Sequence, residues 1–114
     1  MVAKKSYTPD RGDLVWLTFD PTRGHEQRGR RPALVVSPRS YNASSGLAIA
    51  CPVTSQVKGY PFEVAVSIRK KQSVILVDQV RSVDWAQREA EKIMAAPAHV
   101  TEQVQAYLRK LVLE

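Results

Sequence analysis

The stretch PALVVSPRSYNASSGLAIACPVT, residues 32–54, predicts two β-strands separated by a turn. Residues 32–37 are a short apolar run, which suits a strand that is buried on both faces. Residues 46–54 carry the next strand pattern, and YNASSG at residues 41–46 is rich in the residue types that form turns. The middle of the chain is therefore expected to be β-structure built around a buried core.

Strand patterns continue on both sides of this stretch. Residues 12–20, GDLVWLTFD, are rich in β-branched and aromatic residues and are bounded by turn formers. Residues 60–68 alternate between apolar and polar side chains, which is the period of a strand with one buried face. Residues 73–85, SVILVDQVRSVDW, predict one or two strands, with polar residues where the apolar run breaks.

The C-terminal segment changes period. Apolar residues recur there at helical spacing, at Val100, Val104, Tyr107, Leu108 and Leu111. Pro97 stands where such a helix could begin, because proline suits the first turn. Residues 86–95 are good helix formers by local propensity, although their state stays open from the residues alone. Several short strands followed by one amphipathic helix predict a small, mostly antiparallel barrel or rolled sheet.

The size and charge of the chain indicate one domain with an anionic partner. Its 114 residues fit a single compact domain, 1–114. Seventeen Lys and Arg against 11 Asp and Glu give a formal net charge of +6. A basic balance in a small domain favours a polyanionic partner, usually nucleic acid. Arginine outnumbers lysine, which favours planar, bidentate recognition of phosphate.

Cysteine, histidine and hydropathy argue against several classes of protein. Cys51 is the only cysteine, so the chain cannot form an internal disulfide, and we expect a small buried hydrophobe there. The two histidines, His25 and His99, have no spaced Cys or His partners, so no zinc site and no other cofactor is expected. The N-terminus has no apolar signal core, and no apolar run is long enough to span a bilayer. We therefore expect a cytoplasmic protein.

The segment GHEQRGRRP, residues 24–32, concentrates the groups that could carry chemistry. Cleaving RNA without a metal requires a base for the 2′-hydroxyl, a cation for the developing phosphorane and an acid for the leaving oxygen. Arg31 suits the cationic role, because it stands before Pro32 at the mouth of a strand and is permanently charged. Glu26 or His25 is the better base by proton affinity.

Each of these residues also has a structural interpretation. An arginine-rich loop is more often a solvated or binding surface than a catalytic one, and Glu26 could pair with a neighbouring arginine. Thr54 ends the third predicted strand, where its hydroxyl could bind a phosphate oxygen or only a local backbone group. Trp16 and Trp85 are expected in the core rather than as stacking platforms for bases. From the residues alone, a non-catalytic RNA-binding or SH3-like interaction module stays open.

Three segments resemble, in order, the signature blocks of the MazF/Kid (PemK-like) toxins, which are ribosome-independent mRNA interferases. The segments are RGDLVWLTFDPTRGHEQRGRRPALVVSPRSYN at residues 11–42, CPVTSQVKGYPFEV at residues 51–64 and VILVDQVRSVDW at residues 74–85. The resemblance spans almost the whole chain, residues 7–112. The form of SQVKGYPFEV is similar to the MazF branch rather than to the longer Kid insertion.

The resemblance implies an SH3-like barrel with a C-terminal helix, in which residues 90–95 form a strand, assembled as a homodimer. The implied function is that of the toxin of a type II toxin–antitoxin system, a sequence-specific endoribonuclease that cleaves single-stranded RNA without metal. The implied products are a 2′,3′-cyclic phosphate and a 5′-hydroxyl. The implied partner is an antitoxin with an acidic, disordered tail, and DNA would be contacted only through that antitoxin.

The resemblance also assigns roles to single residues. Arg31 and Thr54 match the catalytic arginine and threonine of the family, and Glu26 matches a residue implicated in substrate contact and proton transfer. RNA contact is expected for His25, Gln27, Arg28, Lys58, Tyr60, Asp78, Gln79 and Arg81. The sequence departs from the family at Leu76, where Kid-like members have an arginine. Arg31 and Thr54 are therefore the expected catalytic pair.

Overall fold

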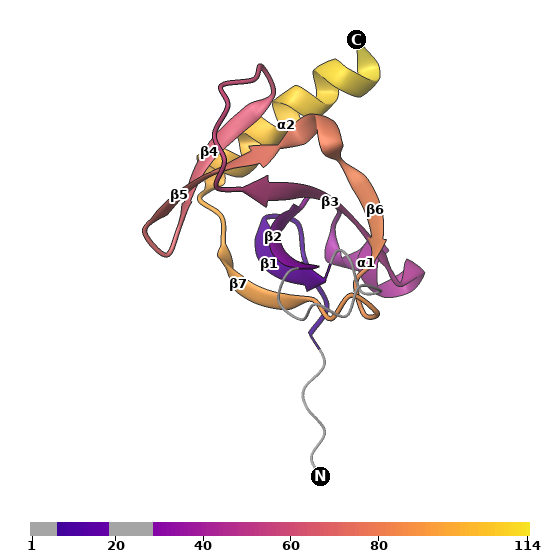
Figure 1. The fold of residues 1–114 in the computed structure, drawn as a ribbon. Coiled ribbons are helices and arrows are strands. Elements are labelled where there is room, and N and C mark those ends of the chain that lie inside the picture. The colour runs from indigo at the N-terminus through magenta and orange to yellow at the C-terminus, as the bar shows by residue number, and fades with distance from the viewer. Residues whose placement is uncertain (1–6, 19–28) are drawn as a thin grey trace.

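The computed structural model describes residues 7–18 and 29–114, which form one curled antiparallel sheet and two α-helices (Figure 1). The elements in chain order are β1 (Asp13–Thr18), β2 (Arg30–Val35), α1 (Arg39–Ser45), β3 (Leu47–Thr54), β4 (Glu63–Ile68), β5 (Lys71–Leu76), the 3₁₀ turn η2 (Val77–Gln79), β6 (Arg81–Asp84), β7 (Glu91–Ala95) and α2 (Ala98–Leu113). The expected mostly-β fold with a C-terminal helix is confirmed.

Strand β3 is the element on which the rest of the sheet assembles. The strand order is β4-β5-β3-β2-β1-β7, and β6 pairs with β3 beside β5. One edge of β3 pairs with β2, in the register Ala33↔Pro52. The other edge pairs with β6 along residues 47–50 and with β5 at residues 53–54. Three pairings on one eight-residue strand bend the sheet, which curls as an open roll in Figure 1.

The sheet buries apolar side chains on both faces, as the apolar runs of the sequence predict. Along β3, Ala48 and Ala50 join one core cluster, and Cys51 and Val53 join the other. Strand residues alternate between the two faces, so this split follows from the backbone alone. Helix α2 covers the second cluster, because Val100 and Val104 of that helix are buried in it.

The cysteine and tryptophan predictions have different outcomes. Cys51 is fully buried, as expected, and burial raises the pKa of its thiol to about 12. Trp85 packs against the first core cluster and donates its indole N–H to the Asn42 carbonyl at 3.0 Å. Trp16 is only half-buried and lies outside both core clusters. The core assignment is therefore confirmed for Trp85 and wrong for Trp16.

The predicted turn at residues 41–46 is wrong, because residues 39–45 form helix α1. Pro38 precedes the helix in an extended conformation, and Gly46 ends it with a left-handed φ of 78°. Asn42 is fully buried, and its side-chain amide donates to the carbonyls of Pro9 and Ser37 at 2.8 and 3.0 Å. These tertiary bonds stabilise a helix whose residues favour turns by themselves.

Residues 91–95 form strand β7, as the family resemblance implies and against their helical propensity. The strand pairs with β1, from Asp13↔Ala95 to Trp16↔Glu91, with a register shift between Leu14 and Val15. Residues 73–85 divide into two strands, with η2 between them at the polar break. Over the described ranges, no helix is long and apolar enough to cross a membrane.

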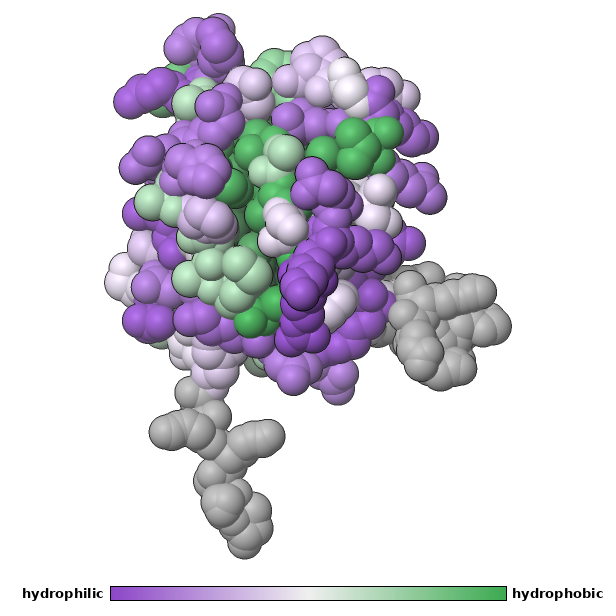
Figure 2. Space-filling view, turned by 90° about the vertical axis from the view of Figure 1, so that its left-hand side faces the viewer, coloured by the Kyte–Doolittle hydropathy of each residue, from purple (hydrophilic) through white to green (hydrophobic). Residues whose placement is uncertain are grey.

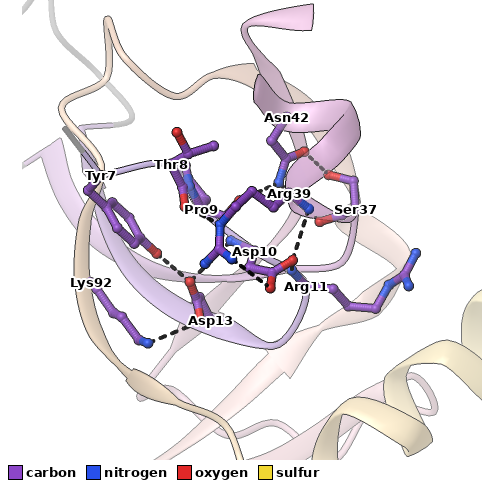
Figure 3. A network of polar contacts seen from close by, with 10 residues as sticks. All are labelled: Tyr7, Thr8, Pro9, Asp10, Arg11, Asp13, Ser37, Arg39, Asn42 and Lys92. Carbon is purple, nitrogen blue, oxygen red and sulfur yellow. Dashed lines mark hydrogen bonds and ion pairs between the residues drawn. The ribbon is translucent and has the colours of Figure 1, made fainter. Parts of the chain in front are cut away.

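A polar network joins the start of β1 to β7 and to the chain before β1 (Figure 3). Asp13 is 5% exposed, and its carboxylate accepts from the Tyr7 hydroxyl at 2.5 Å and from the backbone N–H of Asp10 at 3.1 Å. Lys92 of β7 lies 3.5 Å from the same carboxylate. Burial and then the bond to Asp13 raise the pKa of the Tyr7 hydroxyl. This end of the sheet is therefore closed by paired groups.

The same network reaches helix α1 through Asp10. The Asp10 carboxylate accepts from the backbone N–H groups of Arg39 and Arg11, both at 2.9 Å, and pairs with the Arg39 guanidinium at 3.5 Å. The bond from the Arg39 backbone is the largest cause that lowers the pKa of this carboxyl. Asp10 thus fixes the start of α1 against the chain that enters β1.

Candidate active site

Arg31 and Thr54 meet at the opposite end of the sheet. Arg31 is the second residue of β2 and lies opposite Leu17 of β1. On its other side β2 pairs with β3 up to Ala33↔Pro52, and continuing this register by two residues brings Arg31 opposite Thr54, the last residue of β3. Directly opposed residues share a face of the sheet. Two side chains that are 23 positions apart in the sequence therefore project side by side.

Arg31 is exposed, and within the described ranges its guanidinium has no hydrogen-bond or ion-pair partner. Its neighbour Arg30 is different, because it donates to the Thr18 hydroxyl at 3.0 Å and to the Glu89 carbonyl at 2.8 Å, and pairs with Glu91 at 3.2 Å. Arg30 thus holds β1, β2 and the start of β7 together. The contacts of Arg30 brace this strand end, where Arg31 is exposed to solvent.

The Thr54 hydroxyl is oriented by the chain that follows it. Its Oγ1 accepts from the backbone N–H of Gln56 at 3.1 Å. The hydroxyl proton is therefore left to donate, and a phosphate oxygen is a suitable acceptor. Thr54 is half-buried, so it combines a fixed position with access from solvent. This geometry suits a second contact to the phosphate that Arg31 would hold.

Lys58 and Tyr60 lie on the loop between β3 and β4, close in sequence to Thr54. The Glu63 carboxylate accepts from the backbone N–H groups of Lys58 and Gly59, at 3.3 and 2.9 Å. These bonds shape the loop, and Gly59 supplies the left-handed φ of 75° that the turn requires. Tyr60 is 61% exposed, so its ring is available to a ligand.

Asp78, Gln79 and Arg81 lie further along β3, on the edge opposite β2. Asp78 and Gln79 are exposed residues of η2, and Arg81 begins β6 opposite Ala50. Thr54 is four positions after Ala50, roughly 13 Å along the strand. Arg81 thus pairs with β3 away from the strand end that carries Thr54, and Asp78 and Gln79 come shortly before it in the chain. Burial and then the charge of Asp78 raise the pKa of the Cys51 thiol.

Four predicted site residues, His25, Glu26, Gln27 and Arg28, lie outside the described ranges. The residues that flank this gap are described, and Thr18 pairs directly with Arg30 in the β1–β2 register. The segment 19–28 is therefore attached to the sheet at the strand end that carries Arg31. Among the described residues, no group of three or more His, Cys, Asp and Glu side chains could hold a metal ion.

A pocket that was not predicted from the sequence opens beside Thr54. It has a volume of about 300 Å³ and is lined by residues of five strands and the β4–β5 turn. The lining residues are Trp16, Pro32, Val53, Thr54, Ser55, Ile68, Arg69, Lys71 and Ser73. Some of these residues belong to the family's signature blocks, but neither a motif nor the spacing predicts that they line one pocket, because they come together only through the strand order β4-β5-β3-β2-β1.

Comparison with known proteins identifies the family. Residues 10–112 match the family model of the PemK-like, MazF-like toxins of type II toxin–antitoxin systems, and the chain belongs to this family. Endoribonuclease toxin MazF of Escherichia coli K12 is 52% identical over 86 residues, which are 75% of this chain and 78% of the relative. Endoribonuclease toxin ChpB of the same strain is 35% identical over an alignment 118 residues long, which covers 98% of this chain and 99% of the relative.

Solved structures agree with this family. The crystal structure of MazF (Form-I) from Deinococcus radiodurans has a TM-score of 0.84 and 52% sequence identity, and the match covers 96% of this chain and 100% of that one. The MazE-MazF (Form-II) structure from the same organism has a TM-score of 0.82 and 48% identity, over 94% and 97% of the two chains. The fold expected from the family resemblance is thereby confirmed.

Proposed function

We propose that this chain, an endoribonuclease toxin of a type II toxin–antitoxin system, cleaves single-stranded RNA at specific short motifs through Arg31 and Thr54. The observation that carries the proposal is the Arg31 guanidinium, exposed at the end of β2 where the β2–β3 register leads to Thr54, and unpartnered within the described ranges. A charged group left unpaired beside an oriented hydroxyl suits the binding of an anion that the protein itself does not contain.

The proposed reaction is an internal transfer of the phosphate. The 2′-oxygen attacks the adjacent phosphorus while the bond to the 5′-oxygen breaks, which leaves a 2′,3′-cyclic phosphate and a 5′-hydroxyl. Arg31 stabilises the negative charge on the phosphorane, a role that a fixed cation fills without a metal ion. Thr54 donates to a non-bridging oxygen. Glu26 is the proposed base for the 2′-hydroxyl, with His25 as the other candidate, and the leaving oxygen must gain a proton.

RNA contact is proposed for the remaining predicted residues, which extend the site in two directions. Gln27 and Arg28 belong to the segment beside Arg31, and Lys58 and Tyr60 to the loop after Thr54. Asp78, Gln79 and Arg81 continue along β3. The net charge of +6 supports a polyanionic substrate that occupies such an extended surface.

The proposed protein partners are an antitoxin and a second copy of the chain. A MazE-MazF structure is among the structural matches, and an acidic, disordered antitoxin tail would suit the same basic surface as RNA. A homodimer is supported by an apolar groove of about 790 Å³ between β3 and α2, lined in part by Ile49, Leu108 and Val112. Leu111 and Leu113 are also exposed at that end of α2. A cytoplasmic location, contact with DNA only through the antitoxin, and a single toxin domain over residues 1–114 complete the proposal.

The decisive experiment compares Arg31→Ala with Arg39→Ala on a long RNA in EDTA. Both substitutions remove an exposed arginine, but Arg39 belongs to the polar network around Asp10. The wild-type protein and Arg39→Ala should cut the RNA at the same few motifs and leave 5′-hydroxyl ends, whereas Arg31→Ala should bind RNA without shortening it. RNA that the wild type binds but never cuts would instead identify a non-catalytic binding module.

A further inference from the structure

The pocket beside Thr54 combines an aromatic wall, apolar walls and cations. Trp16 of β1, Pro32 of β2 and Ile68 of β4 supply the apolar surface, and Arg69 and Lys71 line the pocket from the β4–β5 hairpin. Figure 2 views the molecule from the side on which this hairpin lies in Figure 1, and apolar side chains gather in the middle of that face with hydrophilic ones around them. An aromatic surface bordered by cations is the pattern that binds an unstacked base and its phosphate.

Resting on the proposed function, we propose that this pocket holds one base of the RNA, in the nucleotide next to the phosphate that Arg31 and Thr54 act on. The indole of Trp16 provides the stacking surface, and the Ser73 hydroxyl at the pocket wall provides a hydrogen bond to the edge of the base. The cations Arg69 and Lys71 contact the adjoining phosphate. The pocket is then a determinant of which motif is cut.

The position of the pocket relative to the catalytic pair supports an adjacent nucleotide. Thr54 belongs to both, because it lines the pocket and ends β3 opposite Arg31. Pro32 also lines the pocket, and it directly follows Arg31. Consecutive side chains of a strand point to opposite faces, so Arg31 and Pro32 project on the two sides of the sheet end. A nucleotide could place its phosphate on the Arg31 side and turn its base around the strand end into the pocket.

The β4–β5 turn gives a second, independent indication that the pocket binds a ligand. Ile68 pairs with Lys71, so Arg69 and Lys70 are the two central residues of the hairpin turn. Both have left-handed backbones, with φ of 51° and 69°. Turns of this kind prefer Asn-Gly or Asp-Gly, and a long side chain there has a conformational cost. Of the two, only Arg69 lines the pocket. A cation held at a strained turn position on the pocket wall suits a functional surface better than a purely structural turn.

The Ser73 hydroxyl favours a base over an acidic peptide as the molecule that occupies the pocket. Ser73 is 5% exposed, and within the described ranges its hydroxyl has only one hydrogen bond, to the Lys71 carbonyl at 3.4 Å. This weak bond leaves the Ser73 oxygen able to accept from a base amino group as well as to donate. A carboxylate offers only acceptors, whereas bases offer both donors and acceptors.

Ser73→Val and Lys71→Gln test the proposal, with Lys70→Gln as the matched control. Valine keeps the strand preference but fills the pocket and removes the hydroxyl. Lys70 carries the same charge on the same turn and does not line the pocket. Each protein is incubated with a long RNA, and the 5′-hydroxyl ends are mapped by sequencing. Thermal melting checks that each variant is folded.

Ser73→Val should relax the base preference at one position flanking the cut and lower kcat/KM on the preferred motif about tenfold, the effect of losing one base contact. Lys71→Gln should lower kcat/KM on all motifs and reduce its dependence on salt, because one phosphate contact is lost. Lys70→Gln should cut as the wild type does. If Ser73→Val does not fold, Ser73→Ala and Lys71→Gln carry the same test.

A cutting profile that Ser73→Val and Lys71→Gln leave unchanged would overturn the assignment of the pocket while the proposed function stands. A wild type that cuts no RNA would instead overturn the proposed function itself. If the pocket binds an acidic peptide instead, Ser73→Val and Lys71→Gln should weaken the binding of poly-glutamate and leave the cutting profile unchanged. That result would also overturn the proposal.

Stacking on Trp16 has a separate spectroscopic test. Trp85→Phe leaves Trp16 as the only indole, since the chain has two tryptophans. An RNA of the preferred motif with a 2′-deoxy sugar at the cut site binds without reaction, and the stacked base should quench the fluorescence of Trp16. Removing that one base from the RNA should abolish the quenching. Quenching that persists without the base would place the nucleotide elsewhere.

Discussion

The charged groups at the two ends of strand β1 differ in whether they are paired. At the Asp13 end, the carboxylates of Asp13 and Asp10 are paired with the Tyr7 hydroxyl, with backbone N–H groups and with Lys92 and Arg39. At the other end, Arg31 projects into solvent beside Thr54. Paired groups stabilise the fold and have no capacity left for a ligand, whereas an exposed cation on a rigid strand costs little and can bind one. The first end should therefore govern stability, and the second should govern activity.

The largest expected effect separates two consecutive arginines. Arg31→Ala should lower kcat/KM for RNA cleavage by about 10³-fold, because it removes the proposed stabilising charge of the transition state. Arg30→Ala should instead lower the free energy of unfolding by about 2 kcal/mol, because four acceptors lose a donor. Urea unfolding and initial cleavage rates measure the two effects. Equal losses of activity and unchanged stabilities would remove the distinction between these residues.

The next effect is at the paired end. Asp13→Ala should destabilise the fold by about 2 kcal/mol, since it leaves the half-buried Tyr7 hydroxyl without its acceptor and frees the start of β1. Cleavage by the folded fraction should keep its wild-type kcat. Chemical denaturation gives the stability, and single-turnover cleavage well below the unfolding midpoint gives the rate. A large fall in kcat with an unchanged midpoint would mean that this end also participates in catalysis.

A smaller effect is expected for Thr54. Thr54→Val keeps the β-branched shape and removes only the hydroxyl, so kcat/KM should fall about tenfold, the contribution of one hydrogen bond to a charged group. The loss should be clearly smaller than that of Arg31→Ala. Thermal melting should be nearly unchanged, because the Thr54 hydroxyl accepts only one local bond. A loss as large as that of Arg31→Ala would assign Thr54 a direct role in proton transfer.

The smallest effect is a dependence on pH. The pKa of Tyr7 is raised in the folded state, so its contribution to stability is complete below the ordinary tyrosine pKa and decreases as the pH rises above about 10. Tyr7→Phe should cost about 1 kcal/mol at neutral pH and flatten the loss of stability above that pH. Unfolding midpoints between pH 8 and 11 provide the measurement. Parallel curves for the two proteins would show that Tyr7 is not the group responsible.

Most strands of the fold and the two central residues of the candidate site could be predicted from the sequence. The strand patterns are local, and the RP step at Arg31 and the PVT segment at Thr54 are short motifs within them. Helix α1 was missed because Asn42 is held by Pro9 and Ser37, which no local pattern reports. Arg31 was singled out by its place before Pro32, but the structural role of Arg30 was missed, since Arg30 is paired with residues about 60 positions away.

The attachment of three strands to β3 has a consequence for the synthesis of this toxin. Arg31 and Thr54 are translated in the first half of the chain, but β5, β6 and β7, which pair with β3 and β1, are translated in the second half. The proposed catalytic pair therefore gains the support of these neighbouring strands only after most of the chain has been translated. We expect the nascent protein to be harmless to the message that encodes it until its own translation is nearly complete.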